Sequence, residues 1–164
     1  MARKNKIKDL FLLLAGLIGV IGFFMFLLSP LTRLAQTALG KNVALSYEQV
    51  YFGKNLEISG STLQVNKGAI GPFIAFIVAL LIAIYYFVAG FSKLKKNKIL
   101  GFIVFILGIA CSVIMFLTKT FFVNANNLSA IAESYQLGVG AILGGILTAI
   151  STLFGGYALL ITKK

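Results

Sequence analysis

Four long runs of uncharged, mostly apolar residues constrain this chain more than any other feature of its sequence. None of them contains Asp, Glu, Lys, Arg or His, and they cover about 10–29, 71–91, 99–118 and 137–161. An α-helix of about 20 such residues spans the roughly 30 Å hydrocarbon core of a bilayer. The sequence therefore predicts an all-α membrane protein, a four-helix transmembrane bundle that forms one domain over residues 1–164.

The composition agrees with lipid as the main solvent. Of the 164 residues, 59% are hydrophobic and 12% are charged, whereas soluble domains carry about 25% charged residues. The net charge of +11 comes from basic residues beside the hydrophobic runs, which suits anionic lipid better than nucleic acid. The expected partners are the bilayer and, on the loop between the second and third spans, anionic headgroups near Lys93, Lys95, Lys96 and Lys98.

The distribution of Lys and Arg predicts the orientation. Ten of the fifteen lie before the first span, in the 92–98 loop and at the C-terminus. Short basic segments stay on the cytoplasmic side. We expect a multi-pass protein of the cell membrane with both termini and the 92–98 loop cytoplasmic, and with loops 30–70 and 119–136 outside. The first run is longer than the apolar region of a signal peptide, so we expect it to be retained.

The first outer loop carries the clearest strand pattern. Apolar residues alternate over 56–59 and 62–65 around Gly60-Ser61, which predicts a β-hairpin. We expect one or two more strands over 43–52, a turn at 53–55, and together a small extracellular antiparallel β-sheet in this loop.

Two further segments outside the spans predict helices. Ser29-Pro30 and the apolar spacing that follows predict a short amphipathic helix over 30–39; the alternative is that the first span continues past a kink at Pro30. In the second outer loop, 125–135 is expected to begin the fourth helix outside the membrane.

Small residues recur along the spans and predict how the helices pack. The last span has Gly140, Gly144, Thr148, Thr152 and Gly156, and the second and third spans have Gly71, Ala75, Ala79, Ala83, Gly108 and Ser112. Helices in lipid associate by close backbone approach at such residues. We expect packing within one bundle; the alternative is an oligomer interface at Gly140 and Gly144. Each four-residue step turns about 40°, so the two halves of the last ladder should face different helices.

The residue inventory argues against catalysis. The chain has no His, one Cys and only four acidic residues, so we predict no catalytic, metal or cofactor site and no enzyme activity. The spans also lack the intramembrane ionisable residues that are typical of coupled transporters. Thr148 and Thr152 leave open a narrow polar path, which makes a small pore or an accessory subunit of a transport complex the alternative function.

Three aromatic residues of the first outer loop have two interpretations. Tyr47, Tyr51 and Phe52 either form a partner-binding surface or fill the small core of the sheet and anchor it at the membrane. We expect a binding, assembly or structural role, with loop 30–70 as the recognition surface for another membrane or extracellular protein.

The layout resembles the claudin-type tetraspan arrangement in topology, with both termini inside and a longer strand-forming first outer loop. The claudin first-loop tryptophans and paired cysteines are absent, because the chain has no Trp and its one cysteine is Cys111. The Lys-rich start, Gly-rich spans and Lys-rich inner turn are similar to those of small, uncharacterised four-span membrane proteins of low-GC Gram-positive bacteria. That resemblance implies no particular activity.

Overall fold

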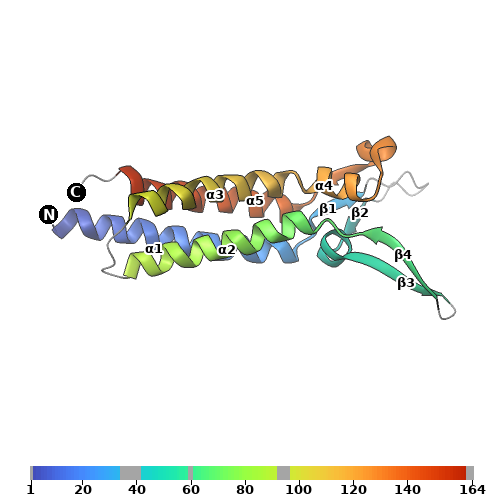
Figure 1. The fold of residues 1–164 in the computed structure, drawn as a ribbon, viewed down its shortest axis with the longest axis horizontal. Helices are drawn as coiled ribbons and strands as arrows, with labels where there is room; N and C mark the ends of the chain where they lie inside the picture. Colours follow the sequence, from blue (N-terminus) through green and yellow to red (C-terminus); the bar gives the residue numbers. More distant parts are fainter. Residues whose placement is uncertain (1, 34–41, 59–60, 92–96, 162–164) are drawn as a thin grey trace.

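The structure, a computed structural model, describes residues 2–33, 42–58, 61–91 and 97–161. Four long helices lie side by side, and the described strands lie at one end of them (Figure 1). The helices are α1 (Ala2–Phe24), α2 (Ile70–Phe91), α3 (Lys98–Phe116) and α5 (Val139–Gly156). A 3₁₀ turn, Met25–Leu27, extends α1, and a π-helical segment, Tyr157–Ile161, extends α5.

Large apolar side chains cover the outside of the long helices. Leu81 of α2 is 60% exposed and Ile99 of α3 is 72% exposed, which suits contact with lipid tails rather than water. Within the described residues, four segments are long and apolar enough to cross a membrane, namely Lys6–Leu27, Ile70–Phe91, Lys98–Phe116 and Val139–Leu160. This is the architecture of a multi-pass membrane protein, as predicted.

Close backbone contacts hold the bundle together. Helix α1 packs against both α2 and α5, and α3 packs against α5 and α2. A Cβ atom added at Gly16 of α1 would lie 2.7 Å from the Cβ of Phe87, and one at Gly19 would lie 2.6 Å from the Cβ of Ala83. Both distances are shorter than van der Waals contact, so glycine is required where α1 crosses α2.

At the end that carries the strands, three short segments form one antiparallel sheet. The strands are β1 (Leu31–Arg33), β2 (Val43–Leu45) and β5 (Tyr135–Leu137), in the order β2-β1-β5. In the register, Thr32 of β1 is opposite Ala44 of β2 and Gln136 of β5. A small antiparallel sheet was predicted, but one of its strands, β5, comes from the segment between α3 and α5, which the sequence did not indicate.

The helix predicted over 30–39 is wrong at its start, because Leu31–Arg33 is the central strand β1; residues 34–39 lie outside the described part. Ser29 precedes Pro30, and a residue before proline favours an extended backbone. The Ser29 hydroxyl lies 2.9 Å from the carbonyl oxygens of Leu31 and Leu45. The pairing of β1 with strands on both sides therefore overrides the local helical pattern. The alternative, continuation of α1 beyond Pro30, is wrong for the same reason.

The segment 119–136, predicted as the second outer loop, also differs from its prediction. A short helix, α4 (Thr118–Ala125), follows α3 directly, and a 3₁₀ segment, Ser129–Ser134, leads into β5. The fourth helix therefore does not start over 125–135. Asn127 ends the preceding helical segment with a left-handed backbone (φ 54°), a conformation that asparagine tolerates better than most residues.

The predicted hairpin is present with a shifted turn. Its strands are β3 (Gly53–Ile58) and β4 (Ser61–Lys67). Ile58 is opposite Ser61, so residues 59–60 join the strands and not 60–61. The turn predicted at 53–55 is instead the start of β3, and the chain reverses before it in a π-helical segment, Glu48–Phe52. The register also shifts between Lys54 and Asn55, which are opposite Asn66 and Gln64, so Val65 of β4 is the extra residue of a bulge.

Replacing Gly140 with alanine should destabilise the bundle. The added Cβ would lie 2.5 Å from the carbonyl oxygen of Leu28 and 2.8 Å from that of Met25, and backbone atoms cannot move aside as a side chain can. Overpacking of this kind costs about 1–3 kcal/mol, which a titration with SDS would measure as a lower free energy of unfolding. At Gly71, the control, the added Cβ meets only the Phe121 ring, at 3.3 Å. Wild-type stability in Gly140→Ala would contradict close packing at this position.

Candidate interaction surface

The hairpin β3–β4 extends away from the axis of the bundle, beyond the other described elements at that end (Figure 1). Within the described residues, its strands pair with each other and with no other strand. Each strand therefore has an outer edge that is not paired with another described strand, and such edges readily accept a further strand. These two edges make the hairpin the candidate interaction surface of the described residues.

The register gives the hairpin two different faces. Leu56 is opposite Leu63, whereas Glu57 is opposite Thr62. Opposite residues share a face, and successive residues alternate between faces. The register positions of Leu56 and Leu63 therefore alternate along the strands with those of Glu57 and Thr62.

Two glycines form the base of the hairpin. Gly53 has a left-handed backbone (φ 87°), and a Cβ there would lie 2.5 Å from the carbonyl oxygen of Asn66. At Gly68, a Cβ would collide with the backbone of Tyr51 and Phe52. The amide of Ala69 donates to the carbonyl of Val50 over 2.8 Å. These contacts join the π-helical segment before the hairpin to the start of α2 after it.

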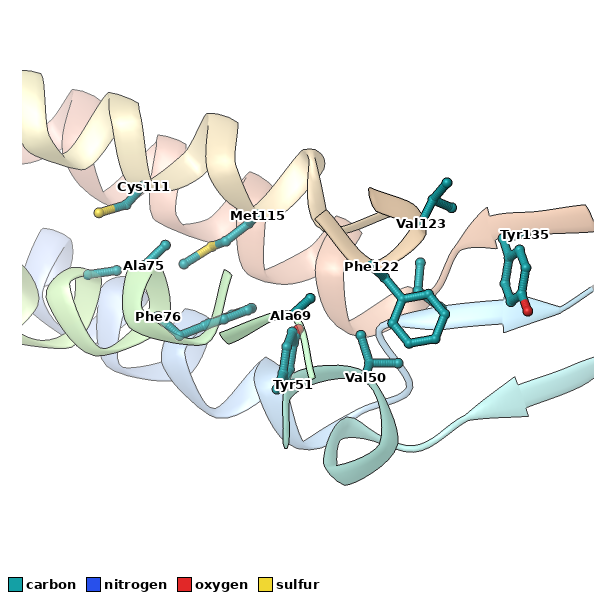
Figure 2. Packing of buried hydrophobic residues seen from close by; sticks show 12 residues of the cluster. Val50, Tyr51, Ala69, Ala75, Phe76, Cys111, Met115, Phe122, Val123 and Tyr135 are labelled. Carbon is teal, nitrogen blue, oxygen red and sulfur yellow. The ribbon is translucent and has the colours of Figure 1, made fainter. Parts of the chain in front are cut away.

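Aromatic side chains surround this base and connect it to the bundle. The ring of Phe73 in α2 lies 4.8 Å from that of Phe52 and 5.4 Å from that of Phe26, measured between centroids. Figure 2 shows Tyr51 among Val50, Ala69 and Phe122, where the base of the hairpin meets α2 and α4. Aromatic pairs in these edge-on geometries are stabilising beyond their buried area, so the base is held firmly against the helices.

Asn126 connects the α3–α5 connection to the hairpin of the α1–α2 connection. Its side-chain oxygen accepts from the amide of Lys67 at 2.6 Å, and its side-chain nitrogen donates to the carbonyl of Lys67 at 2.9 Å. The same nitrogen donates to the carbonyl of Phe122 at 3.0 Å. The end of β4 is thereby fixed to the end of α4. No local sequence pattern marks Asn126, because its partner is 59 residues away.

The three aromatic residues predicted as a possible partner surface differ in their exposure. Tyr51 is fully buried, so its placement favours the interpretation that it fills a core. Burial raises the pKa of its hydroxyl, and the nearby Thr118 hydroxyl opposes this shift. Phe52 is 51% exposed. Tyr47 is half-buried and donates to a carboxylate oxygen of Glu48 at 3.2 Å, which raises its pKa.

The small residues of the last span lie inside the bundle. The positions Gly140, Gly144, Thr148, Thr152 and Gly156 are all buried. Gly140 faces the end of α1, whereas Gly156 faces Phe105 of α3. A Cβ at Gly144 would collide with the Phe76 ring of α2. The two halves of this ladder contact different helices, as expected from the rotation of an α-helix.

The small residues of the other spans also face their neighbours. In α2, Ala75, Ala79 and Ala83 are buried and Gly71 faces Phe121 of α4. In α3, a Cβ at Gly108 would collide with Thr152, and the Ser112 hydroxyl donates to the carbonyl of Gly145 at 2.9 Å.

The Thr148 and Thr152 hydroxyls, which could have lined a polar path, make contacts within the bundle. Thr152 donates to the carbonyl of Thr148 at 2.8 Å, and the Thr148 hydroxyl lies 3.6 Å from the sulfur of Met115. Both side chains are buried. Since these hydroxyls bond to the bundle itself, the geometry favours a packing role over a pore lining.

Charged and metal-binding groups do not assemble into a site in the described part of the chain. No group of three His, Cys, Asp or Glu side chains is close enough there to hold a metal ion. Lys98 is exposed at the start of α3, at the end of the bundle away from the strands, while Lys93, Lys95 and Lys96 lie outside the described residues. Comparisons with protein-family models, curated proteins and solved structures found no match.

Replacing Asn126 with alanine should release the end of β4 from α4. The amide of Lys67 loses its acceptor and becomes open to water, so its hydrogen exchange should become at least several-fold faster. Hydrogen–deuterium exchange of the purified protein, followed by mass spectrometry of the peptide that contains Lys67, measures this. Asn124→Ala is the control, since Asn124 is an exposed asparagine in the last turn of α4, just before Asn126. Equal protection of Lys67 in the two variants would show that Asn126 does not hold the hairpin.

Proposed function

We propose that this chain is a non-catalytic protein of the cell membrane that recognises another membrane or extracellular protein through its β3–β4 hairpin. The single observation that carries the proposal is a hairpin fixed at its base and unpaired with other described strands along both edges. Preorganised surfaces bind better because less conformational entropy is lost on association. An extended segment of the partner adding to one of the two edges is the binding mode that this geometry suits best.

The positions of the basic residues support placing the hairpin outside the cell. Lys6, Lys8 and Lys98 lie at the end of the bundle away from the strands. Basic residues near span ends favour the cytoplasmic side. We therefore place both termini in the cytoplasm, with the Lys-rich loop against anionic headgroups and the hairpin on the outer face.

A recognition role predicts position-specific crosslinking in cells. A photoreactive amino acid in place of Glu57, within the hairpin, should give an adduct with a distinct second protein. The same amino acid in place of Glu133 is the control, because that exposed residue lies on the second outer loop. Adducts are detected by a mass shift on gels and identified by mass spectrometry. No adduct from position 57, or the same adducts from both positions, would contradict the proposal.

A second variant separates recognition from folding. Residues 56–63 are replaced by Asn-Gly, which closes a two-residue turn between Asn55 and Gln64, residues that are opposite each other in the register. This shortened hairpin keeps the glycine base and the Asn126 contacts. It should keep the wild-type unfolding free energy and lose the partner from co-purification after crosslinking; retention of the partner would place recognition elsewhere.

A further inference from the structure

The hydrogen bonds of Lys67 show which backbone groups of the hairpin point outward. Its amide and its carbonyl both bond to the Asn126 side chain, whereas the neighbouring Asn66 is opposite Lys54 of β3. In an antiparallel ladder, both backbone groups of one residue point to the same side, and successive residues alternate between the partner strand and the outer edge. The backbone groups of Lys67 therefore belong to the outer edge of β4.

The same alternation locates the outer groups farther along both strands. Because Lys54 directs its backbone groups at β4, the outer groups of β3 that follow belong to Asn55 and Glu57. Gln64 and Thr62 are opposite these two residues, so their backbone groups form the outer edge of β4. The two edges of the hairpin can therefore be compared residue by residue.

The outer edge of β4 is interrupted and partly occupied. Val65 is the extra residue of the bulge, which breaks the two-residue spacing of hydrogen-bonding groups along the edge. At the base, Asn126 bonds to Lys67 through a carboxamide, which donates and accepts as a peptide group does. This end of the edge thus already carries a peptide-like group from its own chain. Bulges and covering groups of this kind protect a strand from pairing further.

The outer edge of β3 is regular. The extra residue of the bulge lies on β4, so Asn55 and Glu57 keep the two-residue spacing of a strand. Within the described residues, no strand pairs with this edge and no side chain bonds to it as Asn126 bonds to β4. Figure 1 shows β4 on the side of the hairpin toward α4 and β3 on the far side. A further strand therefore meets fewer obstacles at β3.

We propose that the partner contributes an extended peptide segment, which adds to the outer edge of β3 and not to that of β4. This inference rests on the proposed function and gives the chemistry of the ligand, namely a row of main-chain amides and carbonyls in a strand conformation. Strand addition of this kind takes its affinity mainly from main-chain hydrogen bonds. At the base of β4, the Asn126 carboxamide already makes the contacts that a peptide group of such a segment would make.

Crosslink mapping tests whether the bound segment is extended. The photoreactive amino acid is placed at position 57, as above, and in a second sample at position 55, and mass spectrometry locates each attachment in the partner. Residues two apart on one strand face residues two apart on the next. The two attachments should therefore lie roughly two residues apart in one segment of the partner. A spacing of three or four residues, as on a helix, or attachments in unrelated segments would overturn the proposal.

Matched proline substitutions test the choice of edge. Asn55 and Gln64 are opposite each other and both direct their amides outward, so proline at either position removes an outer donor and leaves the bonds between the strands intact. With the photoreactive amino acid at position 57, Asn55→Pro should lower the adduct yield about tenfold, the effect of a lost hydrogen bond together with the bulk of the ring. Gln64→Pro should leave the yield within about twofold of the parent. Equal yields in the two variants, or a greater loss in Gln64→Pro, would overturn the proposal.

Failure of this inference is distinguishable from failure of the proposed function. If position 57 gives no adduct in the otherwise unchanged chain, the recognition role itself is wrong. If that adduct forms and Asn55→Pro does not reduce it, recognition through the hairpin stands and the choice of β3 is wrong. Hydrogen exchange of the peptide that contains Lys67 checks that both proline variants keep the base of the hairpin. The crosslink mapping uses no proline, so it decides the extended form of the segment even where a variant does not fold.

Discussion

The junction between the end of α1 and the start of α5 is the contact on which the strand-bearing end of the structure depends. The amide of Gly138 donates to the carbonyl of Pro30 at 2.8 Å, and that of Gly140 donates to the carbonyl of Ser29 at 3.0 Å. A side chain at either glycine would collide with the backbone of the other segment. Because the first and last spans are joined backbone to backbone here, the strands that flank this junction, β1 and β5, are brought into register.

The arrangement of the sheet and the hairpin follows from this junction. Once β1 pairs with β5, the segment between α1 and α2 and the segment between α3 and α5 share one sheet, and β2 completes it on the other side of β1. The Asn126 contacts with Lys67 and the aromatic packing around Phe73 then fix the base of the hairpin. The hairpin is thus held at its base by the bundle while its strands extend freely, which is the arrangement from which we infer recognition.

The four spans and the existence of the hairpin could be predicted from the sequence because both have strong local patterns. Uncharged runs are sufficient to identify the spans, and alternation over 56–65 identified the hairpin. Strands β1 and β5 are three residues each, too short for any period to be read, and they form only because distant segments meet. For the same reason, the sequence does not predict the contacts of Asn126 or the burial of Tyr51. The junction glycines, Gly138 and Gly140, are visible in the sequence, but their partners are not.

Disulfide formation across β1 and β5 tests most directly whether the α1–α2 and α3–α5 connections fold as one unit. Thr32 and Gln136 are opposite each other in the register, so the double variant Thr32→Cys, Gln136→Cys in a Cys111→Ala background should form a disulfide under mild oxidation. The control pair, Thr32→Cys with Ser129→Cys, should stay reduced, because Ser129 lies in the preceding 3₁₀ segment. Rapid disulfide formation in the first pair alone is the predicted result. Equal oxidation of both pairs, or of neither, would contradict a shared sheet.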